Sequence, residues 1–248
     1  MTDQRTAIAD RMPRDLTIET TSRCQLRCVM CPHAFGAVRR PGHFPDELLP
    51  RLGNALDAAE RVQLHGIGEP LLSPAFWAML DRLPTTIMGS VNTNLAVRND
   101  ELVLRLARSR LRKISVSLDA ATAPTYRDIR GFDFDVVTEN VRLLAANRPK
   151  NHSLSLNMTI MRRNAPEIPE FVRLAHSLGV RIVQFWHLNR LPDRAIAEQR
   201  VQREDWLFDY AEQGLWDEIA ETRELLEEAK QVAAGLKMKV KLDQNKEI

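Results

Sequence analysis

The sequence has few cysteines, no long hydrophobic run and almost no net charge, and each of these absences excludes a class of protein. Its 35 Lys and Arg nearly balance its 33 Asp and Glu, which is too even for a protein whose main partner is the nucleic-acid backbone. No run approaches the roughly 20 apolar residues of a membrane helix, and the first residues lack the apolar stretch of a secretory signal. We therefore expect a cytoplasmic protein with neither a membrane nor a nucleic acid as its partner.

All three cysteines, Cys24, Cys28 and Cys31, are clustered in one short segment of a 248-residue chain. An odd number of clustered thiols in a cytoplasmic chain argues against a disulfide framework and favours a metal centre or a reactive thiol. A structural zinc ion takes four protein ligands, so three cysteines leave one position open unless His33 supplies the fourth ligand. Iron-sulfur clusters are also held by thiolates, and a cubane bound by three cysteines keeps one iron available for another ligand. Both interpretations fit these residues.

Short β-type runs alternate with helical segments up to residue 189, which predicts an α/β fold with a parallel sheet and right-handed crossovers. The expected strands are residues 15–22, 61–66, 86–94, 112–119, 153–161 and 181–189, and the expected helices are residues 46–59, 74–83, 99–109, 133–147 and 166–178. We expect a tail over residues 1–13, a core barrel over residues 14–190, and a helical extension over residues 191–248. The extension would pack on the core and close with a strand-like segment near its end.

The expected strands alternate polar and apolar residues, although buried parallel strands are normally continuous hydrophobic runs. Ile114 and Val116 share one face of their strand, and Ser115 and Ser117 share the other. The same pattern predicts the polar face of the other strands, at Thr17, Glu19, Thr21, Gln63, His65, Ser90, Asn92, Asn94, Asp119, Ser155, Asn157, Thr159, His187 and Asn189. We infer a partial barrel with helices on its apolar face and a wet, ligand-holding interior. An antiparallel sheet with one face in water is the alternative.

Further motifs follow the other expected strands. The C-x3-C-x2-C loop follows the first strand, "GIGEPLL" the second and "NTN" the third, and "SVSLDAATAPTYRDIRG" begins in the fourth. Together these motifs resemble those of the radical S-adenosylmethionine (radical SAM) enzymes. Loops at the carboxyl ends of parallel strands meet at one edge of a sheet, where they build sites. The resemblance covers residues 14 to about 190. It implies a partial (β/α)6 TIM barrel of the radical SAM type with a helical C-terminal segment.

The resemblance also implies cofactors and the residues that hold them. Cys24, Cys28 and Cys31 would ligate one 4Fe-4S cluster, and its open iron would bind SAM. The implied SAM contacts are Met30, Gly66, Gly68, Glu69, Asn94, Ser117, Asp119, Arg130 and Asn157. Arg130 would pair with the SAM carboxylate, a task that its planar donors suit. Ile67 between the two glycines, Ala96 near an expected glycine and Met30 at an often aromatic position depart from the family pattern.

The resemblance implies reductive cleavage of SAM to methionine and a deoxyadenosyl radical, which abstracts hydrogen from a substrate that the protein aligns. Because all three thiols are committed to the cluster, none remains to return a hydrogen atom. This favours redox-neutral elimination, rearrangement or decarboxylation of a small polar substrate, sugar-like or nucleoside. The candidate substrate contacts are Glu19, Gln63, His65 and His187. We expect a flavodoxin or ferredoxin electron donor to dock near Arg23, Arg27, Arg39 and Arg40.

Several alternatives stay open on the residues alone. The motifs are most similar to the SPASM and Twitch subgroup, which carries auxiliary clusters, yet no cysteine follows Cys31. The chain could therefore be a fragment that lacks an auxiliary-cluster domain, or an inactive relative. It could also be a dehydrogenase or a peptide-modifying radical SAM enzyme. The alternative outside the enzymes is a zinc-binding protein that uses the three cysteines and His33. Substrate, fate of the substrate radical, consumption or regeneration of SAM, and oligomeric state are not specified.

Overall fold

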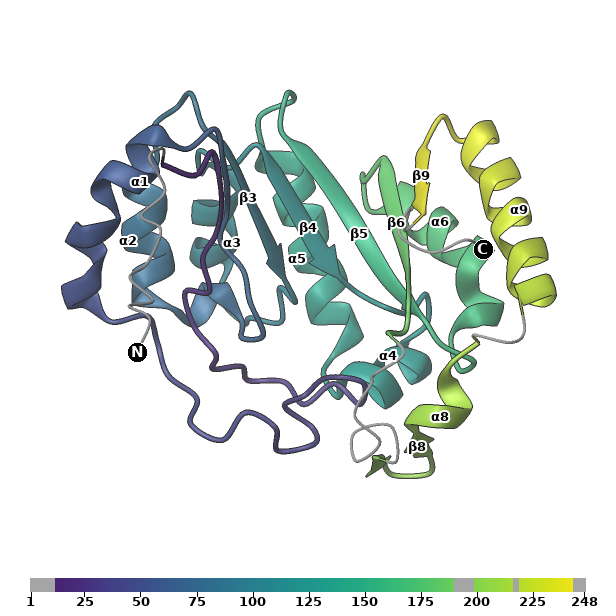
Figure 1. Ribbon diagram of the computed structural model, residues 1–248. Helices are drawn as coiled ribbons and strands as arrows, with labels where there is room; N and C mark the ends of the chain where they lie inside the picture. Colours follow the sequence, from purple (N-terminus) through teal and green to yellow (C-terminus); the bar gives the residue numbers. More distant parts are fainter. Residues whose placement is uncertain (1–11, 190–198, 216–218, 243–248) are drawn as a thin grey trace, which may run out of the picture.

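The computed structural model describes residues 12–189, 199–215 and 219–242, which form a mostly parallel sheet backed by helices (Figure 1). The remaining residues, 1–11, 190–198, 216–218 and 243–248, lie outside the described part. They include most of the expected tail and parts of the expected extension. No helix within the described ranges is long and apolar enough to cross a bilayer.

The main sheet has seven parallel strands in the order β1-β2-β3-β4-β5-β6-β9. Its strands are β1 (Asp15–Thr17), β2 (Arg61–Gln63), β3 (Met88–Thr93), β4 (Lys113–Ser117), β5 (Ser153–Ile160), β6 (Ile182–His187) and β9 (Lys239–Leu242). Strands β7 (Arg200–Gln202) and β8 (Leu207–Asp209) form a separate antiparallel hairpin. Parallel pairing in this order confirms the predicted α/β fold. The sheet has one strand more than expected, because β9 of the C-terminal extension pairs with β6.

Helices connect the strands and cover one face of the sheet (Figure 1). They are α1 (Gly53–Ala58), α2 (Pro74–Arg82), α3 (Asp100–Ala107), α4 (Ala123–Arg130), α5 (Phe134–Asn147), α6 (Ile168–Ser177), α8 (Tyr210–Gln213) and α9 (Ile219–Gly235), with 3₁₀ helices η1 (Asp46–Leu52), η2 (Pro70–Leu72) and η3 (Ala165–Glu167). Side-chain caps fix the starts of some of them, as where Asn99 Oδ1 accepts from Leu102 N at 3.0 Å to begin α3. The expected helix over residues 46–59 is split into η1 and α1, with Pro50, which cannot donate an amide hydrogen bond, inside η1.

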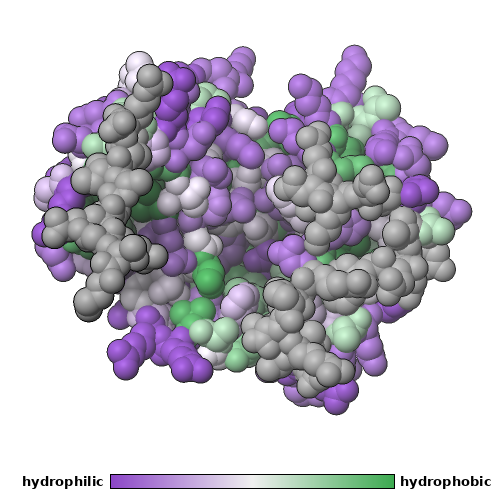
Figure 2. All heavy atoms as spheres, in the orientation of Figure 1, coloured by the Kyte–Doolittle hydropathy of each residue, from purple (hydrophilic) through white to green (hydrophobic). Residues whose placement is uncertain are grey.

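The two faces of the sheet differ as the alternation predicts. On the helix side, Val116 and Phe185 are buried, and the Phe185 ring lies 5.9 Å from that of Phe171 on α6. On the other side, a row of polar side chains crosses the sheet. Gln184 Nε2 donates to Ser155 Oγ at 2.6 Å and to Asn157 Oδ1 at 3.0 Å. Because these buried polar groups bond one another, the interior face can be polar without leaving them unsatisfied. Figure 2 shows a hollow on this face lined largely by hydrophilic residues.

The structure corrects the expected orientation of β6. Its register with β5 aligns Asn157 with Gln184 and Ile160 with His187. Paired residues of parallel strands point to the same face, so Gln184 and Trp186 take the inward positions and His187 lies on the face of Ile160. The inward placement expected for His187 is therefore wrong by one position. The alternation was ambiguous here because apolar residues occupy both faces of this strand.

Candidate functional site

The three cysteines lie on the loop that follows β1, at the carboxyl edge of the sheet. Cys28 is buried, Cys24 and Cys31 are partly exposed, and all three are free thiols. Val29 N donates to Ile129 O at 3.0 Å, which holds the loop against the end of α4. The loop turns tightly where Cys31 N donates to Cys28 O at 2.9 Å. The elements that follow β1 and β4 in the sequence thus meet at the cysteines.

Burial raises the pKa of all three thiols, and that of Cys24 to about 11. Two side chains donate to the sulfurs. Arg130 Nη1 lies 3.4 Å from Cys28 Sγ, and Asn94 Nδ2 lies 3.6 Å from Cys24 Sγ. A thiol that is hard to ionise is a poor nucleophile, whereas a coordinated metal deprotonates a thiol outright. The environment therefore suits metal ligation better than nucleophilic chemistry.

The number and type of the free side chains in the loop bear on which metal group it can hold. Within the described ranges, no three Cys, His, Asp or Glu side chains form a group that could hold a metal ion. A structural zinc ion would need four protein ligands about 2.0–2.3 Å from one ion, with His33 as the fourth beside the three cysteines. A cubane binds each thiolate to a different iron, and the three free thiols of this loop can supply three of its ligands. The residues fit a 4Fe-4S cluster.

The segment after β2 packs tightly against the backbone of the cysteine loop. A Cβ added to Gly68 would lie 2.6 Å from the carbonyl oxygen of Arg23 and nearer still to that of Thr21. Only glycine permits this approach. The Glu69 carboxylate is buried and accepts from Thr93 Oγ1 at 2.6 Å and from Asn94 N at 2.7 Å. Glu69 therefore anchors the segment to the end of β3 with both of its oxygens.

Glu19 and Gly66, which the sequence assigned to different ligands, are in contact with each other. Glu19 Oε1 accepts from Ile67 N at 2.6 Å, and a Cβ on Gly66 would overlap the Glu19 carboxylate. Gln63 and His65 come from β2 and the residues after it; Gln63 is exposed and His65 is half-buried. Burial and the charge of Lys113 lower the pKa of His65. Both side chains belong to the polar face, whereas His187 does not.

Asp119 and Arg130, both expected to contact SAM, are paired with each other. Asp119 follows β4 with a left-handed φ of 62° and is fully buried. Its Oδ2 forms an ion pair with Arg130 Nη2, and its Oδ1 accepts from Thr159 N at 2.6 Å. Burial is the largest single influence and acts to lower the pKa of Arg130, but Asp119 together with Cys28 and Tyr126 outweighs it, so the pKa is raised. Arg130 Nε is buried without a hydrogen-bond partner, so one donor of the guanidinium is uncommitted.

The remaining expected contacts lie in the same region. Ser117 and Asn157 are aligned on β4 and β5 and share the inward face. Asn157 Nδ2 donates to Asn92 Oδ1 at 3.2 Å, so it belongs to the polar row that also contains Gln184. Met30 is partly buried between the main core and a second apolar cluster. That second cluster comprises Val29, Ile129, Met161, Leu188, Phe208 and Tyr210.

The sequence analysis missed a clamp between the cysteine loop and the C-terminal hairpin. Arg203, between β7 and β8, contacts the carbonyl oxygen of Arg27 through Nη2 and that of Asp128 through Nε at 3.2 Å. It therefore ties the cysteine loop to α4. Phe208 and Tyr210 belong to the second apolar cluster together with Val29, so they pack the end of the hairpin against the cysteine loop. No local motif could have indicated this, because the partners are far apart in the chain. Gln184 could have been recognised, because a single amide between the apolar residues Val183 and Phe185 indicates a polar position on an otherwise apolar strand.

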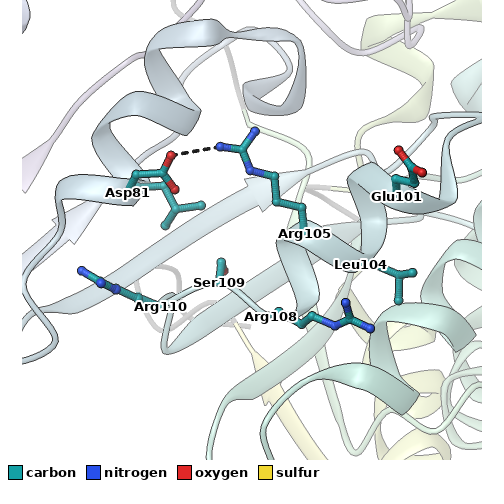
Figure 3. Close-up of a pocket in the computed structure, with 8 residues that line it drawn as sticks. Asp81, Glu101, Leu104, Arg105, Arg108, Ser109 and Arg110 are labelled. Atoms are coloured by element: carbon teal, nitrogen blue, oxygen red, sulfur yellow. Dashed lines mark hydrogen bonds and ion pairs between the residues drawn. The ribbon is translucent and has the colours of Figure 1, made fainter.

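A cavity of ≈ 500 Å³ lies on the outer, helical layer between α2 and α3 (Figure 3). Arg105 on its wall donates to Asp81 Oδ2 at 3.0 Å and lies 4.4 Å from the Trp77 ring centroid. These contacts pack the two helices together. The cavity contains none of the residues expected at the site, and the chemistry-bearing groups lie on the opposite face of the sheet.

Comparisons with known proteins agree with this geometry. The profile of the radical SAM superfamily matches residues 18–175. Mycofactocin maturase MftC from Mycobacterium tuberculosis is 32% identical over 216 residues, which cover 82% of this chain and 54% of that protein. GTP 3',8-cyclase from Desulforamulus reducens is 28% identical over 176 residues, covering 67% of this chain and 53% of that protein. The chain thus spans about half the length of the curated relatives it matches.

A solved structure has the same fold. Streptococcus suis SuiB bound to S-adenosylmethionine superposes with a TM-score of 0.69 at 17% identity, covering 94% of this chain and 50% of that one. The family match includes the cysteine loop, the segment around Glu69, and both Asp119 and Arg130. On the family match and the identity to MftC, the chain belongs to the radical SAM superfamily, whose enzymes use a 4Fe-4S cluster and S-adenosylmethionine.

Proposed function

We propose that this chain cleaves S-adenosylmethionine at a 4Fe-4S cluster held by Cys24, Cys28 and Cys31. The observation that carries the proposal is the meeting of three free thiols with Arg130 and Asn94 at the carboxyl edge of the sheet. When bound, the cluster would supply the electron that cleaves SAM to methionine and a deoxyadenosyl radical. The residues of the chain hold the cluster, orient SAM and the substrate, and exclude water.

The proposed roles of the SAM-site residues divide into contact and positioning. Arg130 would use its uncommitted Nε on the SAM carboxylate, while Asp119 fixes the guanidinium. Glu69 would act through the backbone, because its carboxylate already holds the end of β3. The remaining proposed contacts are Met30, Gly66, Gly68, Asn94, Ser117 and Asn157. We assign them to the core barrel of residues 14–190, with residues 191–248 as an extension packed on it.

The proposed reaction is hydrogen abstraction from a small polar substrate held in the barrel, followed by redox-neutral elimination, rearrangement or decarboxylation. The polar row around Gln184 and Asn157 supports a polar substrate. The commitment of every thiol to the cluster supports a reaction that needs no thiol donor. Glu19, Gln63 and His65 remain proposed substrate contacts. His187, which faces away from the interior, is no longer among them.

A peptide substrate is the second candidate function. MftC is a maturase, and one structure of SuiB, similar at a TM-score of 0.67 and 16% identity, holds the precursor peptide SuiA. In this structure the sheet has two free edges, β1 and β9, among the described strands. An open barrel would admit a peptide as well as a small molecule.

The electron donor is proposed to be a flavodoxin or a ferredoxin. Arg39 and Arg40 follow the cysteine loop and are exposed. Arg27, by contrast, donates to the carbonyl oxygens of Cys24 and Leu26 at 2.8 and 2.9 Å, so it supports the loop itself. Arg39 and Arg40, which are exposed and form no ion pair with any described residue, are therefore the better docking candidates for an acidic donor.

Anaerobic reconstitution tests the proposal. Because the chain has three cysteines, any iron-thiolate signal reports this loop. We expect a cubane spectrum by Mössbauer and paramagnetic resonance, and formation of deoxyadenosine from SAM with a reductant. Cys28→Ala should abolish deoxyadenosine formation, while the exposed Lys150→Met should leave it unchanged. A wild-type protein without a cubane signal, or a Cys28→Ala variant that still cleaves SAM, would overturn the proposal.

A further inference from the structure

Lysine is rare in this chain, yet two lysines occupy inward positions of the barrel. The sequence has 7 lysines against 28 arginines. Lys113 begins β4 and is aligned with Ser90 on β3 and Ser153 on β5, all on the polar face. Lys241 on β9 is aligned with Gln184 on β6, which belongs to the same face. Lys113 and the exposed Lys241 therefore lie on the polar face, on opposite sides of the β5-β6 pair.

Neither ammonium group has a counter-charge in the described structure. Lys113 is partly buried and Lys241 is exposed, and neither forms an ion pair with any described residue. Burial lowers the pKa of Lys113, and Lys241 lowers it further. The charge of Lys113 in turn lowers the pKa of His65, which follows β2. Partly buried Lys113 and His65 and exposed Lys241 thus all lie on the polar face, where like charges disfavour one another.

The surroundings of the two lysines suit a ligand that accepts hydrogen bonds. Ser90 and Ser153 are aligned with Lys113, and Gln184 with Lys241, so neutral polar groups accompany each charge. Trp186 is the next inward residue of β6 toward the carboxyl edge, and 40% of it is exposed. An exposed tryptophan at an inward position is unusual in a barrel, and it offers an apolar surface between the lysines and that edge.

We propose that Lys113 and Lys241 bind an oxyanion of the substrate, a carboxylate or a phosphate, inside the barrel, with Trp186 contacting the part of the substrate nearer the carboxyl edge. This inference deepens the proposed function and rests on it. An oxyanion would remove the repulsion between the lysines and accept a charge-assisted hydrogen bond from each. The ammonium group of lysine is compact and its three donors can rotate, so it can bind an oxyanion in many orientations, unlike the planar guanidinium of arginine.

Binding of simple anions to the reconstituted protein tests the inference. Inorganic phosphate and malonate, titrated separately by calorimetry, distinguish a phosphate site from a carboxylate site. We expect at least one of them to bind, and Lys113→Met and Lys241→Met each to raise its Kd by about tenfold, the effect of losing one hydrogen bond to a charged group. Lys150→Met, which removes an exposed lysine outside the barrel, should leave the Kd unchanged. If neither anion binds, or if all three variants bind alike, the inference is wrong.

Thermal unfolding separates binding from a structural role. Because Lys113 is partly buried beside a like charge, Lys113→Met should keep or raise the Tm of the free protein. The anion that binds should raise the Tm of the wild type and not that of Lys113→Met. A lower Tm for the free variant, with the anion effect retained, would indicate a structural lysine and overturn the inference. These measurements use neither a reductant nor SAM. Failure of the anion-binding inference can therefore be told apart from failure of the proposed SAM cleavage.

Discussion

At the scale of single residues, the buried pair of Asp119 and Arg130 holds the interior of the site together. Their side chains are 0% and 10% exposed, and Arg130 also reaches Cys28. Removing one partner of a buried pair leaves the other charge uncompensated. We expect Asp119→Ala to lower the free energy of unfolding by about 3–5 kcal/mol, measured by urea denaturation.

A matched control is available on the surface of the same region. Asp128 pairs with Arg163, whose side chain is 41% exposed, and such pairs contribute about 0–1 kcal/mol. Asp128→Ala should therefore be nearly neutral. Equal losses in the two variants would mean that the interior pair has no special role in stability.

A second residue-scale prediction concerns pH. Burial, with Arg112 and Arg148, lowers the pKa of His152, whereas an unfolded histidine titrates near pH 6.5. Below about pH 6.5 the unfolded state then binds more protons than the folded state, so stability falls as the pH decreases. We expect His152→Gln to lose less stability than the wild type between pH 7.5 and 5.5, as measured by urea midpoints. The same loss in both proteins would refute this.

Residue types were easier to predict than their partners. The spacing of Cys24, Cys28 and Cys31 indicated a three-thiolate centre, and the structure brings Asn94 and Arg130 to their sulfurs. That Asp119 would pair with Arg130 could not be predicted, because the pair depends on how α4 returns to the sheet. The prediction of which face of β6 points inward was wrong for a different reason. Apolar residues occupy both faces of this strand, so its alternation fits either orientation.

At the scale of elements, the close approach of the segment after β2 to the cysteine loop depends on Gly68. A Cβ there would overlap the backbone of Thr21 and Arg23, which cannot yield as a flexible side chain does. We expect Gly68→Ala to cost about 1–3 kcal/mol of stability through overpacking and to weaken SAM binding. Urea denaturation and calorimetry with SAM would measure the two effects.

Gly53 provides the control for that substitution. It begins α1, and a Cβ there would meet no atom within 4 Å. Gly53→Ala should be neutral or slightly stabilising, since alanine loses less conformational entropy in a helix. A Gly68→Ala variant as stable as Gly53→Ala, with SAM affinity intact, would show that the approach is not constrained.

The elements of the core were largely predictable, and in the extension the helix and the closing strand-like segment were expected but their pairing was not. Six strands begin within two residues of their expected starts, because turn signals precede each β-type run. Helix α4 (Ala123–Arg130) was not among the expected helices, because its residues were considered only as part of the motif that begins in the fourth strand. The role of β9 was missed because a short alternating segment does not reveal its neighbour, and pairing with β6 is a tertiary choice.

At the scale of the whole molecule, the charge near the cysteine loop predicts how an electron donor approaches. Arg39 and Arg40 are exposed beside the carboxyl edge, where an acidic protein could dock. Reversing both charges should slow association, so we expect Arg39→Glu/Arg40→Glu to lower turnover with flavodoxin about tenfold at low salt. The effect should shrink as ionic strength rises, because salt screens exposed charges.

The control variant carries the same change in charge at the other edge of the sheet. Arg82 ends α2 before β3, and Arg108 follows α3 before β4, so both exposed side chains lie near the amino ends of the strands. Arg82→Glu/Arg108→Glu should keep its turnover with flavodoxin, since a donor at the carboxyl edge does not meet these residues. Both variants should retain turnover with dithionite, which needs no protein docking surface. Equal losses with flavodoxin in the two variants would point to net charge, and a matching loss with dithionite would point to damage within the site.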